Sequence, residues 1–215
     1  LDTAPITVAA DGTITLGTNC WDVSAVNDKS IIAWTTQTSA PYTVYIGSND
    51  EIFANQDSSY LFSYIGYAES CTPTTVITNL AALNTNSVTD MAYMFQYCGY
   101  RSMSTLNLGA FDTADVTDME GMFAYTGHNA MSIFNVGTAF NTSSVTNMSK
   151  MFYYCLKLAS LDVSNFNTSN VTDMYGLFKY CEALTDVNVT DLLVAFDGFT
   201  VAVNICIYPL SKLSV

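Results

Sequence analysis

The sequence predicts an α/β repeat solenoid whose two ends are rich in β-strands. One motif, Val-Thr-Asp-Met-x-x-Met-Phe-x-Tyr with single exchanges, recurs four times, and its phenylalanines follow one another at intervals of 28, 29 and 26 residues. A short segment of alternating apolar and polar residues follows each motif, and alternation also marks both ends of the chain. A period of about 20 to 50 residues is typical of stacked repeats, because each unit exposes an apolar face that only its neighbours can cover.

Each motif is expected to form a short amphipathic helix. Four residues of the fourth copy share one helical stripe, at spacings i, i+3, i+4 and i+7: Met174, Leu177, Phe178 and Cys181. Thr172 is expected to cap this helix, and Asp173 to place a negative charge beside its N-terminus. Such a helix has only about three turns, so packing rather than helix propensity must stabilise it.

Each predicted helix is followed by a predicted strand and a turn. Residues 106–108, 134–136, 161–163 and 187–189 alternate apolar residues with Asn or Asp, as in a strand with one buried face. An Asx-Thr pair follows three of these strands, at positions 112, 141 and 167, and its side chains can bond their own backbone and fix the turn. A degenerate earlier copy containing Phe62 extends the predicted repeat region to residues 57–189.

The two ends are predicted to be different from the repeats. Residues 1–56 are expected to form an N-terminal β cap, since alternating segments flank Asp11-Gly12, a hairpin signal. Residues 30–34 and 42–46 are predicted as further strands of this cap. Residues 190–215 are expected to form a C-terminal cap or strand.

The C-terminal strand is a candidate for assembly between subunits. It alternates apolar residues at four positions: Val201, Val203, Ile205 and Ile207. An exposed apolar strand is an aggregation hazard, so we expect it to pair with another strand. Pairing with the hairpin of a second copy would be a head-to-tail contact that propagates into filaments.

Composition excludes several classes of partner. Lys and Arg number 6 against 19 Asp and Glu, which gives a formal net charge of −13. Nucleic acid and anionic membranes require clustered cations, so neither is expected as a partner. Residues 192–210 are the most apolar stretch, but Asp197, Gly198, Pro209 and the alternation favour strands over a membrane span.

The six cysteines show no CxxC or Cys/His metal-binding spacing. Cys98, Cys155 and Cys181 occupy one repeat position, at which Thr126 stands in the second copy. A position that accepts either residue is expected to hold a small buried side chain. The alternative is a disulfide, for which Cys155–Cys181 is the plausible pair within the repeat and Cys20–Cys71 a weaker one.

Two rows of side chains are candidate partner-binding surfaces. The outward strand positions form a polar strip: Asn79, Asn107, Asn135, Asp162 and Asn188. The motif also places one tyrosine in each copy, which gives an aromatic row: Tyr64, Tyr97, Tyr125, Tyr154 and Tyr180. The alternative interpretation of the strip is a solvated face with mutual amide hydrogen bonds. The row can bind sugar rings or protein, or simply close the seam between neighbouring helices.

Other polar residues have less specific interpretations. Five asparagines lie in N-x-S/T sequons and are candidate glycosylation sites: Asn141, Asn147, Asn167, Asn170 and Asn188. Asp90, Asp118 and Asp173 are expected to cap helices rather than to bind calcium, since no calcium-loop pattern is present. His128 is the sole histidine and is expected to be exposed in a loop. No cofactor site, metal site or catalytic group is predicted.

The repeat resembles that of the BspA-like leucine-rich-repeat surface proteins. Residues 160–174 carry the resemblance, as Ser-Leu-Asp-Val-Ser-Asn-Phe-Asn-Thr-Ser-Asn-Val-Thr-Asp-Met, and the match extends over about residues 57–189. The resemblance implies a right-handed, leucine-rich-repeat-like solenoid with one short strand and one short helix per repeat. It also implies a secreted or surface-attached protein that adheres to host or matrix molecules, with no catalytic residues.

We therefore expect a non-enzymatic extracellular or cell-surface protein that acts through protein–protein contacts. It would serve as an adhesin or as a self-assembling subunit of a surface filament or layer, with a protein or copies of itself as partners. The alternative is a carbohydrate-binding, lectin-like module that uses the tyrosine row or the polar strip to bind glycans.

Overall fold

The computed structural model describes residues 6–10, 14–22, 31–35, 44–48, 51–67, 77, 79–109, 111–137 and 139–188. The chain divides into two compact units, Leu1–Phe53 and Ala54–Val215. The predicted C-terminal assembly strand at residues 201–207 lies outside the described residues.

The first unit contains two sheets of antiparallel strands, formed by its first five strands. Its strands are β1 (Ile6–Val8), β2 (Ile14–Leu16), β3 (Cys20–Asp22), β4 (Ile31–Trp34), β5 (Tyr45–Ser48) and β6 (Ile52–Phe53). β1 and β2 pair as the hairpin that Asp11-Gly12 predicts, and β3, β4 and β5 form a three-stranded sheet in chain order. The rings of Trp34 and Tyr45 stack across this sheet with their centroids 5.5 Å apart.

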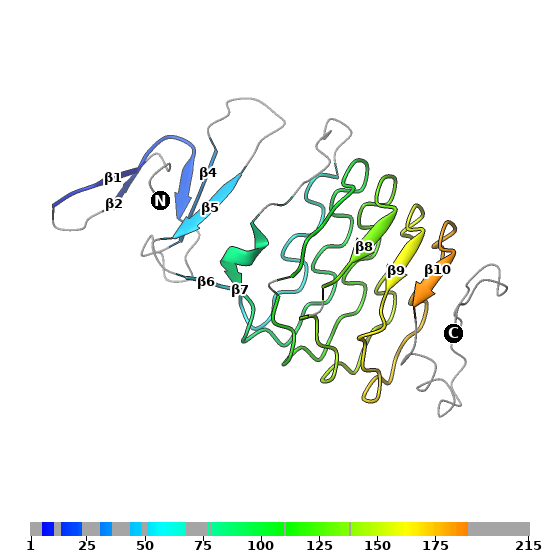
Figure 1. The fold of residues 1–215 in the computed structure, drawn as a ribbon. Helices are drawn as coiled ribbons and strands as arrows, with labels where there is room; N and C mark the ends of the chain where they lie inside the picture. Colours follow the sequence, from blue (N-terminus) through cyan, green and yellow to red (C-terminus); the bar gives the residue numbers. More distant parts are fainter. Residues whose placement is uncertain are drawn as a thin grey trace. The chain divides into compact units, whose positions relative to one another are not determined.

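The second unit contains a parallel sheet made by successive repeats. Its elements are a 3-10 helix η1 (Leu80–Ala82) and strands β7 (Leu83–Asn84), β8 (Ile133–Asn135), β9 (Ser160–Asp162) and β10 (Asp186–Asn188). β8, β9 and β10 lie side by side (Figure 1) and pair in parallel, with Phe134, Leu161 and Val187 in register. Equivalent positions of neighbouring repeats therefore face each other directly.

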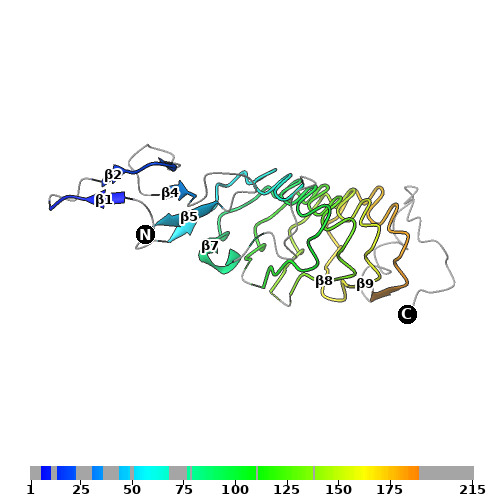
Figure 2. The same ribbon diagram turned by 90° about the horizontal axis from the view of Figure 1, so that it is seen from above.

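A second set of parallel pairings links the motifs themselves. We call residues 57–64, 90–97, 118–125, 147–154 and 173–180 turn segments 1 to 5. Their first residues form parallel bridges from each segment to the next, and in Figure 2 the segments run side by side as successive coils. The repeats thus stack in chain order at both the strand and the motif.

The short helices predicted for the motifs are wrong, because the turn segments contain no helix. In segment 2 every second backbone N–H leaves the segment: those of Met91, Tyr93, Phe95 and Tyr97 donate to carbonyl oxygens of segment 3. Of the intervening N–H groups, those of Met94 and Gln96 donate to carbonyls three residues back, and that of Ala92 donates to the Asp90 side chain. An α-helix bonds every N–H to the carbonyl four residues back.

The backbone dihedrals also exclude a helix. Tyr93 and Tyr97 have φ of 56° and 58°, in the left-handed region, and the equivalent residues of the other segments share this conformation. A tight turn brings every third or fourth residue back to the same side, so the stripe Met91, Met94 and Phe95 is buried even though no helix forms. The prediction of burial was correct and that of conformation was not.

The core is a column of phenylalanines that runs through all five segments. Neighbouring rings stack with centroids 5.2 to 5.7 Å apart along the series Phe62, Phe95, Phe123, Phe152 and Phe178. Methionines flank the column and are fully buried at several positions, among them Met94 and Met122. Burying one such side chain stabilises the fold by about 1.5–3 kcal/mol. Because these side chains are buried against those of the neighbouring repeats, contact between repeats supplies most of the apolar core.

Three buried threonines join neighbouring repeats at the corners of the stack. The Thr113 hydroxyl donates to the carbonyl of Asn141 in the next repeat and accepts the N–H of the same residue, both at 2.8 Å. Thr85 and Thr142 make the equivalent pairs. The predicted Asx turn is confirmed, since the side-chain oxygens of Asp112 and Asn141 accept the backbone N–H two residues later. The prediction for the threonines is wrong, because their hydroxyls bond the backbone of the next repeat instead of their own.

The strand predicted at residues 106–108 is absent. Leu106 and Leu108 are buried and Asn107 is exposed, so the alternation persists without a ladder that would define a strand. Assignment of the stacked repeats to the leucine-rich-repeat class stays a prediction.

Candidate interaction surfaces

The predicted polar strip lies on the outward face of the strands. Asn107, Asn135 and Asp162 are exposed. Each bonds its own turn, because its side-chain oxygen accepts the backbone N–H two residues later, at 2.8 to 2.9 Å. The predicted mutual amide hydrogen bonds are therefore wrong for these three residues.

The ends of the strip are less regular. Asn79 precedes η1 with a left-handed backbone (φ 58°) and belongs to no strand. Asn188 is the last residue of β10, and its side chain is outside the described part of the chain. The strip therefore comprises Asn107, Asn135 and Asp162 in the described residues.

Sequence reasoning missed an apolar residue in this strip. Ile133 is 68% exposed, the largest exposed fraction among the exposed large apolar side chains of the described residues. It lies two residues before Asn135 on β8 and so shares its face. The signal was available, because Ile133 occupies the outward position at which Ser160 and Asp186 stand in the next repeats.

The predicted tyrosine row forms one continuous stack. Ring centroids of successive members lie 4.8, 4.3, 4.9 and 4.3 Å apart along Tyr64, Tyr97, Tyr125, Tyr154 and Tyr180. Burial raises the pKa of the Tyr97 and Tyr125 hydroxyls, and their mutual hydrogen bond raises that of Tyr125 further. Each of the three inner tyrosines, Tyr97, Tyr125 and Tyr154, therefore packs against a neighbouring tyrosine on both faces of its ring.

His128 lies in a turn, as predicted, but it is buried, so the prediction of an exposed side chain was wrong. Only 6% of the residue is accessible, and its ring stacks on that of Tyr100 at 4.5 Å. Its Nδ1 bonds the carbonyl oxygen of Tyr154 in the following repeat. His128 takes the position three residues after the row tyrosine, where Tyr100 stands in the preceding repeat, and this alignment was the available signal.

The motif aspartates fix turns instead of capping helices. Asp90, Asp118 and Asp173 each accept the backbone N–H two residues later at 2.8 Å, and Asn147 does so at 3.0 Å. The predicted Thr172 cap is likewise wrong, because its hydroxyl donates to the carbonyl of Thr146 in the preceding repeat. Among the described residues no group of His, Cys, Asp or Glu is arranged to hold a metal ion.

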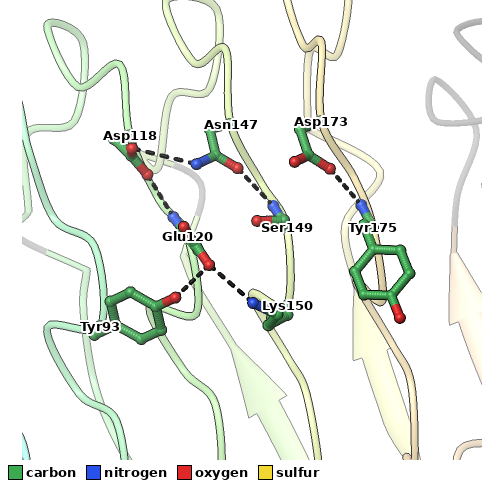
Figure 3. Close-up of polar contacts among 8 residues, drawn as sticks. All are labelled: Tyr93, Asp118, Glu120, Asn147, Ser149, Lys150, Asp173 and Tyr175. Atoms are coloured by element: carbon green, nitrogen blue, oxygen red, sulfur yellow. Dashed lines mark hydrogen bonds and ion pairs between the residues drawn. The ribbon is translucent and has the colours of Figure 1, made fainter.

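A polar cluster joins segments 2, 3 and 4 (Figure 3). Glu120 accepts hydrogen bonds from the Tyr93 hydroxyl and from the Lys150 ammonium group, the latter at 3.1 Å. Burial raises the pKa of the Glu120 carboxyl, but these two partners outweigh it and hold the pKa below its usual value of 4.5. Burial and the bond to Glu120 raise the pKa of Tyr93.

Replacing Glu120 by glutamine is expected to lower the free energy of unfolding at pH 7 by about 0.5–1 kcal/mol, since the ion pair is partly exposed. The folded-state pKa is lowered, so this contribution is present above about pH 4.5 and is lost as the pH falls through the folded-state value. Urea unfolding of both proteins from pH 7 to pH 3 should show the difference shrinking. The exposed Glu182→Gln provides a control with the same charge change.

The cysteine position holds a buried hydrogen-bond donor. The Cys155 and Cys181 thiols donate to the carbonyls of Phe123 and Phe152 in the preceding repeats, at 3.2 and 2.9 Å. The Thr126 hydroxyl makes the same bond to Phe95 at 2.7 Å. Both thiols are free, and the neighbouring Cys181 thiol and burial raise the pKa of Cys155. The prediction of a small buried side chain is confirmed in all four copies, at Cys98, Thr126, Cys155 and Cys181.

Cys155→Thr is expected to leave the free energy of unfolding within about 0.5 kcal/mol of the original, because threonine already makes this bond at position 126. Valine has nearly the same shape as threonine but no hydrogen-bond donor, so Cys155→Val should lower the free energy of unfolding by about 1 kcal/mol more than Cys155→Thr does. Urea unfolding under reducing conditions distinguishes the two. Equal stability of the two variants would show that the bond to the Phe123 carbonyl contributes nothing.

The sequon asparagines fall into two groups. Asn147 and Asn170 use their amide nitrogens to donate to Asp118 and to the Ser143 carbonyl, at 3.2 and 2.7 Å. Asn141 and Asn167 are exposed, and only their side-chain oxygens are bonded within the described residues. These two are the better-placed acceptors, and glycosylation itself stays a prediction.

Comparison with known proteins identifies a family for the repeats. No helix in the described residues has the length and apolarity needed to cross a membrane. Curated proteins and solved structures give no match. A family profile described as "Mycoplasma protein of unknown function, DUF285" matches residues 72–138 and 89–194, which together span more than half of the chain and include turn segments 2 to 5. The chain belongs to the DUF285 family.

Proposed function

We propose that the protein is a non-enzymatic extracellular or cell-surface protein that binds other proteins through the polar strip. The observation that carries the proposal is Ile133, an exposed apolar side chain that shares the outward face of β8 with Asn135 and pairs in register with Ser160, two residues before Asp162 on β9. An apolar anchor within a polar rim is the usual composition of a protein-binding hot spot. The resemblance of the repeat to BspA-like surface proteins supports the surface location and a role in adhesion or assembly.

The strip is well prepared for binding. The side-chain oxygens of Asn135 and Asp162 are held by their own turns, and both residues lie on paired strands. Groups that are already ordered lose less conformational entropy when a partner binds. The amide nitrogen of Asn135 has no hydrogen-bond partner among the described residues, so it can bond a partner protein. The Asp162 carboxylate already accepts hydrogen bonds from the backbone and the side chain of Ser164, and it contributes mainly its negative charge.

Charge narrows the class of protein partner. The net charge is −13, and Asp162 adds a carboxylate to the strip. A complementary surface therefore carries Lys or Arg beside an apolar pocket, and the charges would speed association at low salt.

No observation favours the lectin-like alternative. Sugar binding by aromatic residues requires an accessible ring face, and the inner tyrosines Tyr97, Tyr125 and Tyr154 stack on neighbours at both faces. A silent glycan array is the expected result for the full chain.

Binding of the full chain to a panel of immobilised extracellular-matrix proteins tests the proposal. We expect binding to at least one of them, an affinity loss of about tenfold or more for Ile133→Asp, and none for Ser169→Asp. Ser169 is exposed, lies outside the strip, and gives the same charge change. An empty panel, or equal binding by the Ile133 variant, would contradict the proposal.

A further inference from the structure

Turn segment 1 ends the stack with carbonyl groups that accept no hydrogen bond from the part of the chain that the structure describes. In segments 2 to 5 alternate carbonyls accept N–H groups from the preceding segment. The equivalent carbonyls of segment 1 accept none from the described residues: those of Asp57, Ser59, Leu61 and Ser63. This end of the stack therefore presents a row of carbonyl oxygens with the spacing of the ladder.

Turn segment 5 ends the stack with the complementary donors. Alternate N–H groups of segments 1 to 4 donate to the following segment. The equivalent groups of segment 5 find no acceptor among the described residues: those of Met174, Gly176, Phe178 and Tyr180. The two ends of the stack thus carry matching rows of opposite hydrogen-bonding type.

The acceptor end is also apolar. Five of the twelve exposed large apolar side chains of the described residues belong to it: Tyr60, Leu61, Tyr64, Ile65 and Tyr67. Tyr64 is 54% exposed and has only one neighbour in the tyrosine stack, and Tyr180 at the donor end is 39% exposed. The end of a soluble repeat stack needs a polar outer face, so this surface is suited to being covered.

We propose that the donor end of one copy binds the acceptor end of a second copy, so that the repeat ladder continues from chain to chain. Tyr180 of the first copy then stacks on Tyr64 of the second, and Phe178 stacks on Phe62. The N–H groups of segment 5 donate to the carbonyls of segment 1 in the register that every internal pair of segments uses. This contact is head-to-tail and propagates into a filament.

The inference deepens the assembly role within the proposed function, but it does not depend on the polar strip. We choose a second copy as the partner because one chain carries both the donor row and the acceptor row. The tyrosine row and the phenylalanine column also reach both ends of the stack, so two copies would match at all of these positions. Like charges on the copies oppose their association, so added salt should strengthen self-association. Salt would weaken the binding of a basic partner to the strip.

Sedimentation velocity of the full chain, over a concentration series at low and high salt, tests this contact. We expect concentration-dependent oligomers that increase with salt. Tyr64→Asp and Leu61→Asp disable the acceptor end, and Tyr180→Asp disables the donor end, so each variant alone should associate about tenfold more weakly or worse. Ser169→Asp has the same charge change at an exposed residue outside both ends of the stack, and it should assemble as the original chain does.

An equimolar mixture of Tyr64→Asp and Tyr180→Asp gives the most specific outcome. Each variant keeps the end that the other lacks, so the mixture should form dimers and stop there. Circular dichroism and thermal unfolding confirm that the variants are folded, and Leu61→Asp replaces Tyr64→Asp if the latter is not. A full chain that stays monomeric, or a mixture that stays monomeric, would overturn the proposal.

Deletion of residues 199–215 separates this contact from strand donation by the C-terminal segment. We expect the shortened chain to assemble at least as strongly as the full chain. Loss of assembly would assign the contact to residues 201–207 and contradict pairing of the turn segments. Failure of these experiments leaves the strip proposal intact, because the matrix-protein panel and Ile133→Asp test that surface separately.

Discussion

Replacing Phe123 by alanine is expected to lower the free energy of unfolding by about 3–5 kcal/mol. Phe123 is the central ring of the phenylalanine column and is buried. It stacks on Phe95 and Phe152 at 5.7 and 5.4 Å and meets the edge of Phe134 at 4.8 Å. Its removal leaves a cavity between three repeats, which equilibrium urea unfolding would register.

Phe62→Ala is the matched control for this prediction. Phe62 is only partly buried and has a single stacked neighbour in the column, Phe95 at 5.2 Å. We expect it to cost less than half as much as Phe123→Ala. Equal losses at the two positions would mean that stacking between repeats is not what stabilises the core.

Gly127→Ala is expected to cost about 3 kcal/mol or more. Gly127 has φ of 53°, where a residue with a side chain is strained by about 1–2 kcal/mol. An added Cβ would also lie 2.5 Å from the Met131 Cβ and 2.8 Å from the carbonyl oxygen of Met103. Overlap of this kind in a packed core costs about 1–3 kcal/mol more, and thermal unfolding would show both contributions together.

Gly176→Ala separates the strain from the overlap. Gly176 has a similar φ of 67°, but its nearest neighbour to an added Cβ is the Lys179 Cβ at 3.6 Å, an ordinary contact. Only the strain of about 1–2 kcal/mol should remain. If this variant were as unstable as Gly127→Ala, the close approach around Gly127 would have no energetic role.

The repeat period and its buried residues were predictable from the sequence. Met91, Met94 and Phe95 face the core as expected, since any stacked repeat must bury the same positions in every copy. The Asx turns at Asp112 and Asn141 were also predictable, because such side chains bond their own backbone in many turns. The bonds of Thr113 and Thr142 were not, because they reach the next repeat.

The conformation of the motif was not predictable from its spacing. Residues at i, i+3, i+4 and i+7 return to one side in a helix, and they also do so in a ribbon of tight turns. The distinction depends on bonds to the neighbouring segment and on a left-handed backbone at Tyr93 and Tyr97. Tyrosine has no preference for that region, so its presence there comes from the stack.

The candidate surfaces were predicted in part for a related reason. Outward positions such as Asn135 follow from the alternation of a strand. The rows of carbonyls at one end of the stack and of N–H groups at the other exist only because alternate N–H groups bond the neighbouring segment. A helix would bond these groups internally, so predicting helices for the motifs gave no indication of the two rows. His128 was misassigned because its partners, Tyr100 and Tyr154, come from the preceding and the following repeat.

Amide hydrogen exchange, resolved by residue, tests most directly whether the repeats stack through a continuous backbone ladder. The N–H groups of Met119, Gly121, Phe123 and Tyr125 donate to the next segment at 2.8 to 3.0 Å. These four are expected to exchange only through global unfolding, at one common free energy. Rapid exchange of these four, with protection retained at Met122 and Ala124, which bond within the segment, would show that the turns form without the stack and would contradict the account.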